Sequence, residues 1–428
     1  MGNKAQADRI SRRSFIKTSA AVSAAMAAPS GNIFAAGSGK IRVGLVGCGS
    51  RGTGAAINCL DADPAVELVA MADVFDDMLQ GSLKRIRKKY GKRVTVTPET
   101  SFLGFDAYKK LIDCDLDIVM LATPPGFRPI HVRAAVEAGR NMFVEKPGAV
   151  DPVGVRSLLK SAEMADAKGL SIVVGTQQRW QPQYREIMRR IHDGELGEVV
   201  GGQACWHWGQ SKWHWQPRKP EWSDMEWQIR CWPCFTWLSG DHYVEQHFHN
   251  MDVINWAIGS HPVQCLGIGG RQARTGPEFG NIFDHFAVEF EYPGGVRVQS
   301  MASQIEGSTA RWAERIVCTK GRTCTTRSYG YIEGPKAWKY DGPNYSGKVK
   351  EHQGLIAAIR DGKPLNECKR LAETSLTMVM GRMSAYTGRA LKWEWALKAS
   401  KLDLSPEKYE LGPLPVRPVA IPGKTKLV

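Results

Sequence analysis

The sequence predicts two folded domains in series: an α/β domain with a parallel sheet, then an α+β domain with a large, mostly antiparallel sheet. Apolar strands alternate with helices between Lys40 and Gly175. After Val199 the pattern changes to the alternation typical of half-buried strands. The chain has 428 residues, more than one ordinary core accommodates. Its 43% hydrophobic and 23% charged residues are typical of folded globular proteins.

The first 36 residues are expected to lie outside both domains. Arg12 and Arg13, followed by Phe15, precede a short alanine-rich apolar run over residues 18–28. This order is typical of a twin-arginine signal peptide, and the run is too short to span a bilayer as a stable helix. We therefore expect a periplasmic or otherwise exported protein without a membrane span.

A glycine-rich turn directly follows the first apolar strand, residues 41–46. Gly47 permits the tight turn, Gly49 lets the backbone approach a pyrophosphate, and Gly52 lets the next helix pack closely on the strand. The N-terminus of that helix supplies backbone amides to phosphates. A strand before the glycines and a helix after them together predict a Rossmann dinucleotide-binding domain.

An acidic residue at the end of the second strand favours NAD as the dinucleotide. This strand, residues 66–72, ends in Asp73, about 21 residues beyond Gly52. A carboxylate there accepts hydrogen bonds from the adenosine ribose and repels a 2′-phosphate. Arg51 could neutralise such a phosphate, so NADP stays possible.

Two further strands end in polar residues that are expected to face the nicotinamide. A helix is predicted over residues 106–112, and the strand 117–122 then leads into Thr123 and Pro124. The strand 141–144 ends in Glu145-Lys146-Pro147. Because the carboxyl ends of parallel strands line the ligand crevice, Thr123, Glu145 and Lys146 are predicted to meet there.

A later segment carries an acid and histidines: Glu245, His249 and Asp252 lie three and four residues apart, so a helix would place them on one face. Together with the glycine turn, the Ala-Thr-Pro loop and the Glu-Lys-Pro triplet, this segment resembles the Gfo/Idh/MocA family of glucose-fructose oxidoreductase and inositol dehydrogenase. Two positions differ from the family pattern. Glu245 stands where an aspartate is common, and Arg128 stands where a histidine is usual, with His131 three residues further on.

The resemblance implies an NAD(P)-dependent oxidoreductase that transfers hydride from or to a hydroxyl carbon of a sugar or polyol. In the family the lysine of the triplet binds the reacting hydroxyl and the histidine is the general acid or base, which maps to Lys146 and His249. A histidine near its ordinary pKa would suit that task. Because NAD is scarce outside the cytoplasm, an exported enzyme is expected to hold it tightly.

Two other functions stay open. One is an NAD-dependent glycoside hydrolase, which oxidises a sugar transiently, eliminates the glycosidic oxygen and returns the hydride; such relatives typically lack the Glu-Lys-Pro triplet that this chain keeps. The other is a non-catalytic sugar-binding relative.

The site residues are assigned by role. Lys146, His249 and Glu245 are assigned to catalysis. Substrate contacts are assigned to Lys146, Arg179, Trp180, His249 and Asp252. The cofactor is assigned to Gly47, Gly49, Ser50, Arg51, Gly52, Asp73, Thr123, Pro124, Glu145, Lys146 and Gln178. No metal is predicted, because the acids and histidines between Asp241 and His249 match no zinc-binding spacing.

The remaining chain is divided into residues 37–175 for the NAD-binding domain, 176–350 for the substrate and oligomerisation domain, and 351–428 for helices and a tail that pack back on the first domain. Helices are predicted over 184–193, 352–361 and 368–387, and strands over 203–208, 282–292, 296–305 and 315–318. The resemblance implies a homodimer or homotetramer formed through the open face of the second sheet.

Eight tryptophans lie between Trp206 and Trp237. Aromatic faces stack on sugar rings, so this group favours a carbohydrate-facing loop, although each tryptophan by itself is more often core or subunit contact. Cys231 and Cys234 in the same stretch lack the strand–turn–helix setting of redox pairs and are expected to form a structural disulfide or to pack as thiols. The formal net charge of +14 comes with no nucleic-acid motif, so no nucleic-acid partner is expected.

Overall fold

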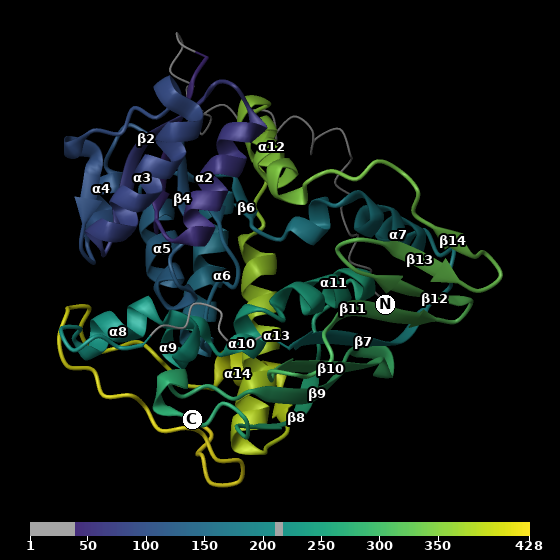
Figure 1. Ribbon diagram of the computed structural model, residues 1–428. Coiled ribbons are helices and arrows are strands. Elements are labelled where there is room, and N and C mark those ends of the chain that lie inside the picture. Colours follow the sequence, from purple (N-terminus) through teal and green to yellow (C-terminus); the bar gives the residue numbers. More distant parts are fainter. Residues whose placement is uncertain (1–38, 210–216) are drawn as a thin grey trace, which may run out of the picture. The chain divides into compact units, whose positions relative to one another are not determined.

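The computed structural model describes residues 39–209 and 217–428, which fold around two sheets (Figure 1). The first sheet is parallel throughout and has the strand order β3-β2-β1-β4-β5-β6. Its strands are β1 (Ile41–Val46), β2 (Val66–Asp73), β3 (Ser101–Leu103), β4 (Ile118–Leu121), β5 (Asn141–Val144) and β6 (Ile172–Val174). This is the predicted Rossmann order, in which the ligand crevice opens where the order reverses, between β1 and β4.

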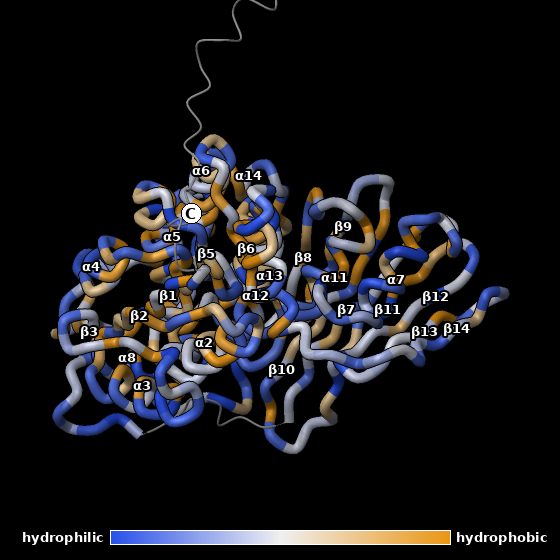
Figure 2. The backbone as a smooth tube through the Cα atoms, turned by 90° about the horizontal axis from the view of Figure 1, so that it is seen from above, coloured by the Kyte–Doolittle hydropathy of each residue, from blue (hydrophilic) through white to orange (hydrophobic). Residues whose placement is uncertain are grey.

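Helices connect these strands, and the central strands are buried on both faces. The helices are α2 (Ser50–Ala62), α3 (Asp76–Tyr90), α4 (Ala107–Ile112), α5 (Arg128–Glu137) and α6 (Pro152–Ala167). Figure 2 shows apolar positions gathered along β1, β5 and β6, as expected for a parallel sheet covered by helices.

The glycine turn explains how α2 starts so close to β1. Gly47 has a φ of +91°, a conformation that L side chains rarely adopt. A Cβ on Gly52 would lie 1.8 Å from the carbonyl oxygen of Gly47, so only glycine lets the helix approach the strand end. The roles predicted for these two glycines match this geometry.

The second sheet has nine strands in the order β14-β13-β12-β11-β7-β10-β9-β8-β15. Its neighbours are antiparallel except for the parallel pair β7 and β10, so the prediction of a large, mostly antiparallel sheet is confirmed. Its strands are β7 (Val199–Trp208), β8 (Gln264–Gly270), β9 (His285–Glu291), β10 (Arg297–Gln304), β11 (Arg311–Cys318), β12 (Gly321–Thr325), β13 (Gly330–Glu333), β14 (Trp338–Lys339) and β15 (Leu391–Lys392).

One face of the second sheet is covered by helices and the other carries exposed apolar side chains. The covering helices are α7 (Pro182–His192), α11 (Phe248–Ile258) and α13 (Cys368–Thr387). On the opposite face Leu266 and Ile268 of β8 are 54% and 71% exposed. The open face of the second sheet therefore carries exposed apolar side chains beside charged ones.

The last part of the chain contacts both domains. Helix α12 (Gly347–Arg360) packs on α2, and α13 lies between α6 and β8. After α14 (Trp393–Lys398) the tail has no further helix or strand. Its residues Leu404 and Tyr409 pack in a cluster with Phe75 and Phe127 of the first domain.

The segment before α11 differs from the predicted single helix. Helix α8 (Asp224–Arg230) and the short helices α9 (Thr236–Ser239) and α10 (His242–Glu245) precede it, and α10 ends at Glu245 while α11 begins at Phe248. The expectation that Glu245, His249 and Asp252 share one continuous helix face is therefore wrong.

Cys231 and Cys234 are both buried as thiols, and burial raises the pKa of Cys234 to about 12. Of the two expectations for this pair, packed thiols is the one the structure bears out. No helix within the described residues is long and apolar enough to cross a membrane. In the same residues no group of three or more His, Cys, Asp or Glu side chains converges in a way that could hold a metal ion.

Candidate active site

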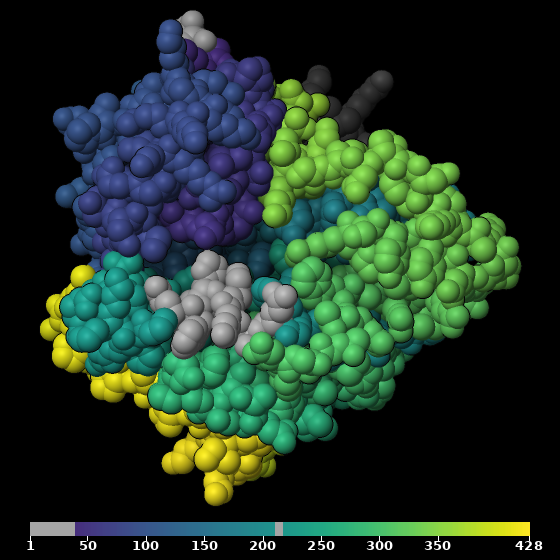
Figure 3. Space-filling view, in the orientation of Figure 1, coloured from purple at the N-terminus to yellow at the C-terminus, as the bar shows by residue number. Residues whose placement is uncertain are grey.

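A cavity of about 690 Å³ lies at the carboxyl edge of the parallel sheet and is lined by residues of both domains. Figure 3 shows the surface hollowed between the purple and blue first domain and the teal and green second domain. The volume lies in the range of small-molecule and cofactor sites. Of the predicted residues, the lining includes Gly47, Gly49, Ser50, Arg51, Asp73, Thr123, Pro124, Glu145, Lys146, Glu245 and His249.

The glycine turn forms a floor that a pyrophosphate can approach. A Cβ added to Gly49 would meet nothing within 4 Å, and Gly49, Ser50 and Arg51 line the cavity at the N-terminus of α2. Gly52 lies behind them, outside the lining, where it packs against Gly47. A bare backbone edge at a helix N-terminus fits a dinucleotide phosphate.

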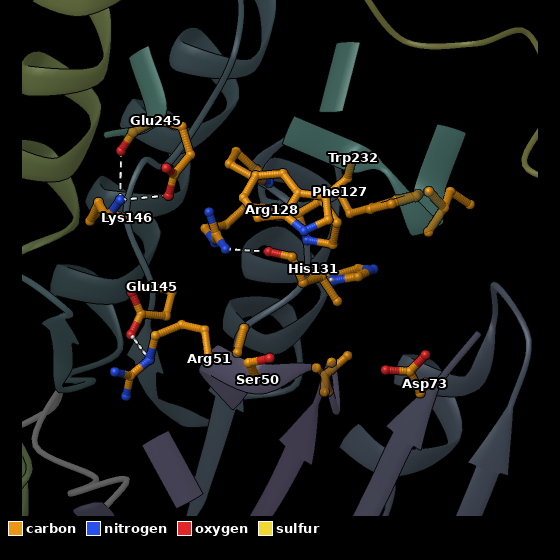
Figure 4. A pocket seen from close by; sticks show the side chains of 18 of the residues that line it. Ser50, Arg51, Asp73, Phe127, Arg128, His131, Glu145, Lys146, Trp232 and Glu245 are labelled. Atoms are coloured by element: carbon orange, nitrogen blue, oxygen red, sulfur yellow. Dashed lines mark hydrogen bonds and ion pairs between the residues drawn. The ribbon is translucent and has the colours of Figure 1, made fainter. Parts of the chain in front are cut away.

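Asp73 and Arg51 together favour NAD over NADP. The Asp73 carboxylate accepts hydrogen bonds from the backbone N–H groups of Cys48 (2.6 Å) and Phe75 (2.9 Å), and burial raises its pKa. The Arg51 guanidinium forms an ion pair with Glu145, with 2.9 Å between Nε and Oε1. Figure 4 shows Arg51 turned toward Glu145 and away from Asp73. Arg51 is therefore not placed to neutralise a ribose 2′-phosphate beside Asp73.

The adenosine side of the cavity is closed by a segment of the second domain, which we call the cofactor clamp: Ile229, Arg230 and Trp232. Arg230 forms an ion pair with Asp77 (3.0 Å) and its guanidinium lies 3.9 Å from the ring centre of Phe75. The tail supports the clamp segment, because the side-chain amide of Gln228 donates to the Leu414 carbonyl (2.6 Å). Three segments that are far apart in the sequence, namely the first domain, the clamp and the tail, therefore meet at the adenosine side of the cavity.

At the opposite end the two domains meet through a buried ion pair. The Lys146 ammonium donates to Glu245 Oε1 (2.6 Å) and to the Glu245 carbonyl (2.5 Å), and both side chains are about nine-tenths buried. Figure 4 shows this pair across the pocket from Asp73. The second carboxylate oxygen of Glu245 is buried without a hydrogen-bond partner among the described residues. The pair therefore has an unused acceptor beside its ammonium.

His249 lies on the same part of the cavity wall, only 4% exposed, and its Nδ1 has no hydrogen-bond partner among the described residues. Burial, and then the charges of Lys146, Arg327 and Lys348, hold its pKa well below the ordinary histidine value. The expectation of a near-ordinary pKa is wrong, because the site is buried and cationic. The imidazole is neutral at neutral pH and is able to accept a proton.

Arg128 joins the two loops that carry Thr123 and Lys146. Its guanidinium donates to the carbonyl oxygens of Thr123 and Pro147. His131 contacts Thr123 through Nδ1 (3.2 Å to Oγ1), and burial lowers its pKa to about 3. Both residues line the cavity. Arg128 stands where the family usually has a histidine, and its role in holding the two loops together was not expected from the sequence.

Besides Gly52, four predicted residues lie outside the cavity lining: Gln178, Arg179, Trp180 and Asp252. Asp252 is buried and paired with Arg179 (2.6 Å) and with Arg370 of α13 (3.0 Å). Trp180 packs against the backbone of α12 at Gly354. Gln178 is buried, and its neighbour Gln177 lines the cavity instead. The structure therefore gives Arg179, Trp180 and Asp252 a packing role behind the site.

Tryptophans of the second sheet form one wall of the cavity. Trp206 and Trp208 of β7 and Trp312 of β11 line it, and the rings of Trp206 and Trp312 stack with centres 5.1 Å apart. Trp232 lines the adenosine side instead, whereas Trp227 and Trp237 are buried core. The predicted Trp213, Trp215 and His214 lie outside the described residues.

Several lining residues were not predicted from the sequence: Tyr108, Phe127, Arg128, His131, Ile229, Arg230, Gln246, Trp312, Arg327 and Lys348. Arg327 follows β12 and Lys348 opens α12, so both come from chain far from any motif. Pro124 and Pro125, which mark the loop after β4, were an available signal for Phe127, Arg128 and His131, because these residues follow directly.

Comparison with known proteins identifies both domains and the export signal. Residues 41–175 match the model described as "Oxidoreductase family, NAD-binding Rossmann fold", and residues 184–323 match "GFO/IDH/MocA C-terminal domain". Residues 9–29 match the twin-arginine translocation signal, so the predicted export route is confirmed. The NAD-binding domain predicted from the glycine turn is likewise confirmed.

Curated relatives include several activities. A 2,7-anhydro-N-acetylneuraminate hydratase of Escherichia coli (strain K12) is 27% identical over 50% of each chain. Inositol 2-dehydrogenase 4 of Saccharopolyspora erythraea is 32% identical over 38% of this chain and 44% of its own. A glycosyl hydrolase family 109 protein of Streptomyces coelicolor is 27% identical over 38% of this chain and 33% of its own. The chain spans half or less of the length of these relatives.

Solved structures share the fold. A levoglucosan dehydrogenase in complex with NADH and levoglucosan superposes with a TM-score of 0.66 at 15% identity, covering 82% of this chain and 99% of its own. An aldose-aldose oxidoreductase from Caulobacter crescentus gives 0.63 at 17% identity with the same coverage. From its two domains and their matches, the chain belongs to the Gfo/Idh/MocA oxidoreductase family.

Proposed function

We propose that this protein is an exported NAD-dependent oxidoreductase that removes hydride from, or returns it to, a hydroxyl carbon of a sugar or polyol. The observation that carries the proposal is that Lys146, Glu245 and His249 meet in the same cavity as the dinucleotide cradle. The tryptophan wall supports a carbohydrate, because indole faces pack on the apolar C–H surfaces of sugar rings.

The chain's own residues hold and move the proton. Lys146 donates a hydrogen bond to the reacting hydroxyl and stabilises the negative charge that develops on its oxygen. Glu245 keeps the ammonium in place through two contacts. His249, neutral in its buried setting, accepts the hydroxyl proton. NAD, when bound in the cradle, supplies the hydride acceptor.

The enclosed adenosine end supports a retained cofactor. The clamp covers the adenosine side, and its ion pair to Asp77 must break before the cofactor leaves. Retention suits an exported enzyme, because a bound NAD that takes hydride from one substrate and passes it on to a second, carbonyl-bearing substrate needs no external supply.

A glycoside hydrolase that works by transient oxidation, elimination and re-reduction is the second candidate. It is favoured by the likeness to glycosyl hydrolase family 109 proteins and by the carboxylate oxygen of Glu245, which has no hydrogen-bond partner among the described residues and is available to move a further proton. The chain keeps the Glu145-Lys146-Pro147 triplet, which supports the oxidoreductase as the first candidate.

One experiment separates the two candidates. The purified protein is mixed with free sugars and with the matching methyl glycosides, while NADH absorbance and released methanol are recorded. An oxidoreductase forms NADH and an oxidised sugar and releases no methanol. Methanol release without lasting NADH shows the glycoside hydrolase, and neither signal with any compound contradicts both.

We also propose that the open face of the nine-stranded sheet joins two copies of the chain. Leu266 and Ile268 stand exposed there, and Met301 of β10 extends the same face through its pairing with Ala287. Light scattering of the purified protein should report a dimer or tetramer, and Ile268→Lys should shift it toward the monomer. A monomeric wild type contradicts this interface.

A further inference from the structure

The cavity holds more positive than negative charge. Six cationic side chains line it, against three carboxylates. Arg51 pairs with Glu145, Lys146 with Glu245, and Arg230 with Asp77, while Arg128 donates to two backbone carbonyls. The two that are left are Arg327 and Lys348. Within residues 39–209 and 217–428, neither has a carboxylate at ion-pair distance.

Arg327 is held rigidly at the tryptophan wall. Its carbonyl accepts hydrogen bonds from the side-chain amides of Gln181 (3.3 Å) and Gln183 (3.1 Å), which fixes the backbone. Its guanidinium lies 5.3 Å and 5.4 Å from the ring centres of Trp206 and Trp312. A stacked guanidinium keeps its edge of N–H donors free for a ligand.

Burial lowers the pKa of Arg327, and the charges of Tyr184, Glu314 and Glu245 act against this. Lys348, in the first turn of α12, has its pKa lowered by burial and by the charges of Arg51 and Arg327, against the opposite effect of Glu145 and Glu351. Two cations that repel each other in a partly dry cavity are costly unless an anion lies between them. Nearby carboxylates offset part of this charge, but none among the described residues forms an ion pair with either cation.

The phosphates of a dinucleotide do not account for this charge. They belong at the glycine turn, where Gly49, Ser50 and Arg51 line the cavity. Arg327 lies instead against the tryptophans of the second domain, and its charge acts on His249. Arg327 therefore borders the part of the cavity that receives the substrate. Lys348 lies between that part and the phosphate cradle, because its charge acts on His249 while Arg51 and Arg327 act on it.

We propose that the carbohydrate taken by this cavity carries an anionic group, a carboxylate or a sulfate ester, which Arg327 and Lys348 bind. The guanidinium fork matches two oxygens of either group, and the ammonium adds a point charge. The sugar ring then lies between the tryptophan wall and the Lys146–Glu245 pair. The inference rests on the proposed function, because it names the substrate class of the same site.

The test measures binding directly, by titration calorimetry on the holoprotein as purified. The probes are glucuronate and glucose, galacturonate and galactose, and glucose 6-sulfate. The variants are Arg327→Gln and Lys348→Gln. The matched control is Lys350→Gln, which removes the same charge two residues further along α12, where the ammonium lies over Tyr345 and outside the cavity lining. Melting curves and NAD content confirm that each variant is folded and loaded.

At least one anionic sugar should bind about 10- to 100-fold more tightly than its neutral partner, the range expected for charge-assisted hydrogen bonds. Arg327→Gln and Lys348→Gln should remove that preference, and Lys350→Gln should keep it. Tight binding of the uronates would identify the anionic group as a carboxylate, and tight binding of glucose 6-sulfate would identify it as a sulfate ester. Equal binding of neutral and anionic sugars, no binding of any anion, or a preference that survives Arg327→Gln overturns the inference.

Turnover is recorded separately on the same samples. If anions bind through Arg327 but no sugar is oxidised and no glycoside is cleaved, the proposed oxidoreductase fails and the anion site stands. If sugars are oxidised but the anionic ones bind no more tightly than the neutral ones, or keep their preference in Arg327→Gln, the oxidoreductase stands and the anion site fails.

Discussion

Lys146 and Glu245 show how single residues join the two halves of the site. One side chain follows β5 of the first domain and the other ends α10 of the second, yet their atoms lie 2.6 Å apart and nearly all of both side chains is buried. A buried ion pair of this kind adds little stability by itself, but removing one partner leaves the other charge uncompensated. In the proposed reaction the pair would hold the ammonium where the hydroxyl oxygen of the substrate arrives.

Replacing Lys146 should abolish turnover while NAD stays bound. We expect Lys146→Met to lower kcat by about 100- to 1000-fold, the cost typical of losing one donor to a developing oxyanion. The double variant Lys146→Met, Glu245→Gln also removes the carboxylate charge that the single variant leaves unpaired. It should therefore restore the melting temperature but not kcat. The control is Lys160→Met, which replaces an exposed lysine of α6. A single variant with an unchanged kcat contradicts the role of Lys146.

The pH dependence of oxidation should reflect the lowered pKa of His249. A histidine whose pKa is depressed stays neutral as pH falls through about 6.5, the ordinary value, so the base form persists into more acidic solution. We therefore expect kcat/KM for sugar oxidation to show no decline near pH 6.5 and to fall only at lower pH. A decline centred at 6.5 that disappears in His249→Asn would show that the imidazole has an ordinary pKa.

Among single residues, the sequence predicted several that line the cavity and missed their surroundings. Lys146, Glu245 and His249 could be singled out because motifs mark strand ends and helix starts, and all three line the cavity. Asp252 was expected beside them, but helical spacing indicates which residues share a face and does not reveal which of them meets a cationic neighbour. Arg370, 118 positions later in the chain, draws Asp252 into a buried cluster behind the cavity.

The glycine turn is the element on which cofactor binding depends most. In Gly52→Ala the new Cβ would lie 1.8 Å from the Gly47 carbonyl, so α2 or the turn must shift. We expect purified Gly52→Ala to contain little NAD and to melt at a lower temperature. Gly54→Ala, on the same helix, meets only the Arg51 side chain at 3.7 Å. It should keep NAD and gain up to about 1 kcal/mol of helix stability. Equal NAD content in both variants would contradict this reading.

The cofactor clamp should control how fast NAD leaves. Arg230→Met removes the ion pair to Asp77 and the contact with Phe75, and we expect NAD release to become about 10-fold faster, in line with one exposed ion pair and one cation–π contact. Arg189→Met removes two ion pairs on α7, away from the cavity, and should leave the release rate unchanged. Release can be followed by reducing the released NAD and measuring the fluorescence of the NADH that forms. A release rate unaffected by Arg230→Met contradicts the clamp.

Elements with strong periodicity were predicted well, and glycine-rich or short ones were missed. Helix α13 was expected over residues 368–387, where it lies. Strand β8 was missed because Gln264–Gly270 holds three glycines and little of the alternation that marks a strand. The break between α10 and α11 follows from tertiary packing, since Gln246 bonds to Gln304 of β10 (2.5 Å) where a continuous helix was expected.

On the scale of the whole molecule, segments far apart in sequence assemble the site. The tail supports the clamp, α12 brings Lys348 to the cavity, and the second sheet brings Arg327 and the tryptophan wall. No local pattern encodes these contacts, which is why the Rossmann half of the site was predicted residue by residue and the substrate half only as a tryptophan-rich region. The twin-arginine signal suits the proposed retained cofactor, because this route exports proteins that are already folded.

The proposed function depends on hydride moving directly between a sugar carbon and a nucleotide held in this cavity. The purified protein, without added cofactor, is given sugars and sugar acids deuterated at their carbon atoms, and the nucleotide is then released and its mass measured by mass spectrometry. We expect about one NAD bound per chain and deuterium recovered in it, with no label in Lys146→Met. A protein that carries no NAD, or a nucleotide that never gains deuterium while the sugar is consumed, would contradict hydride transfer in this cavity.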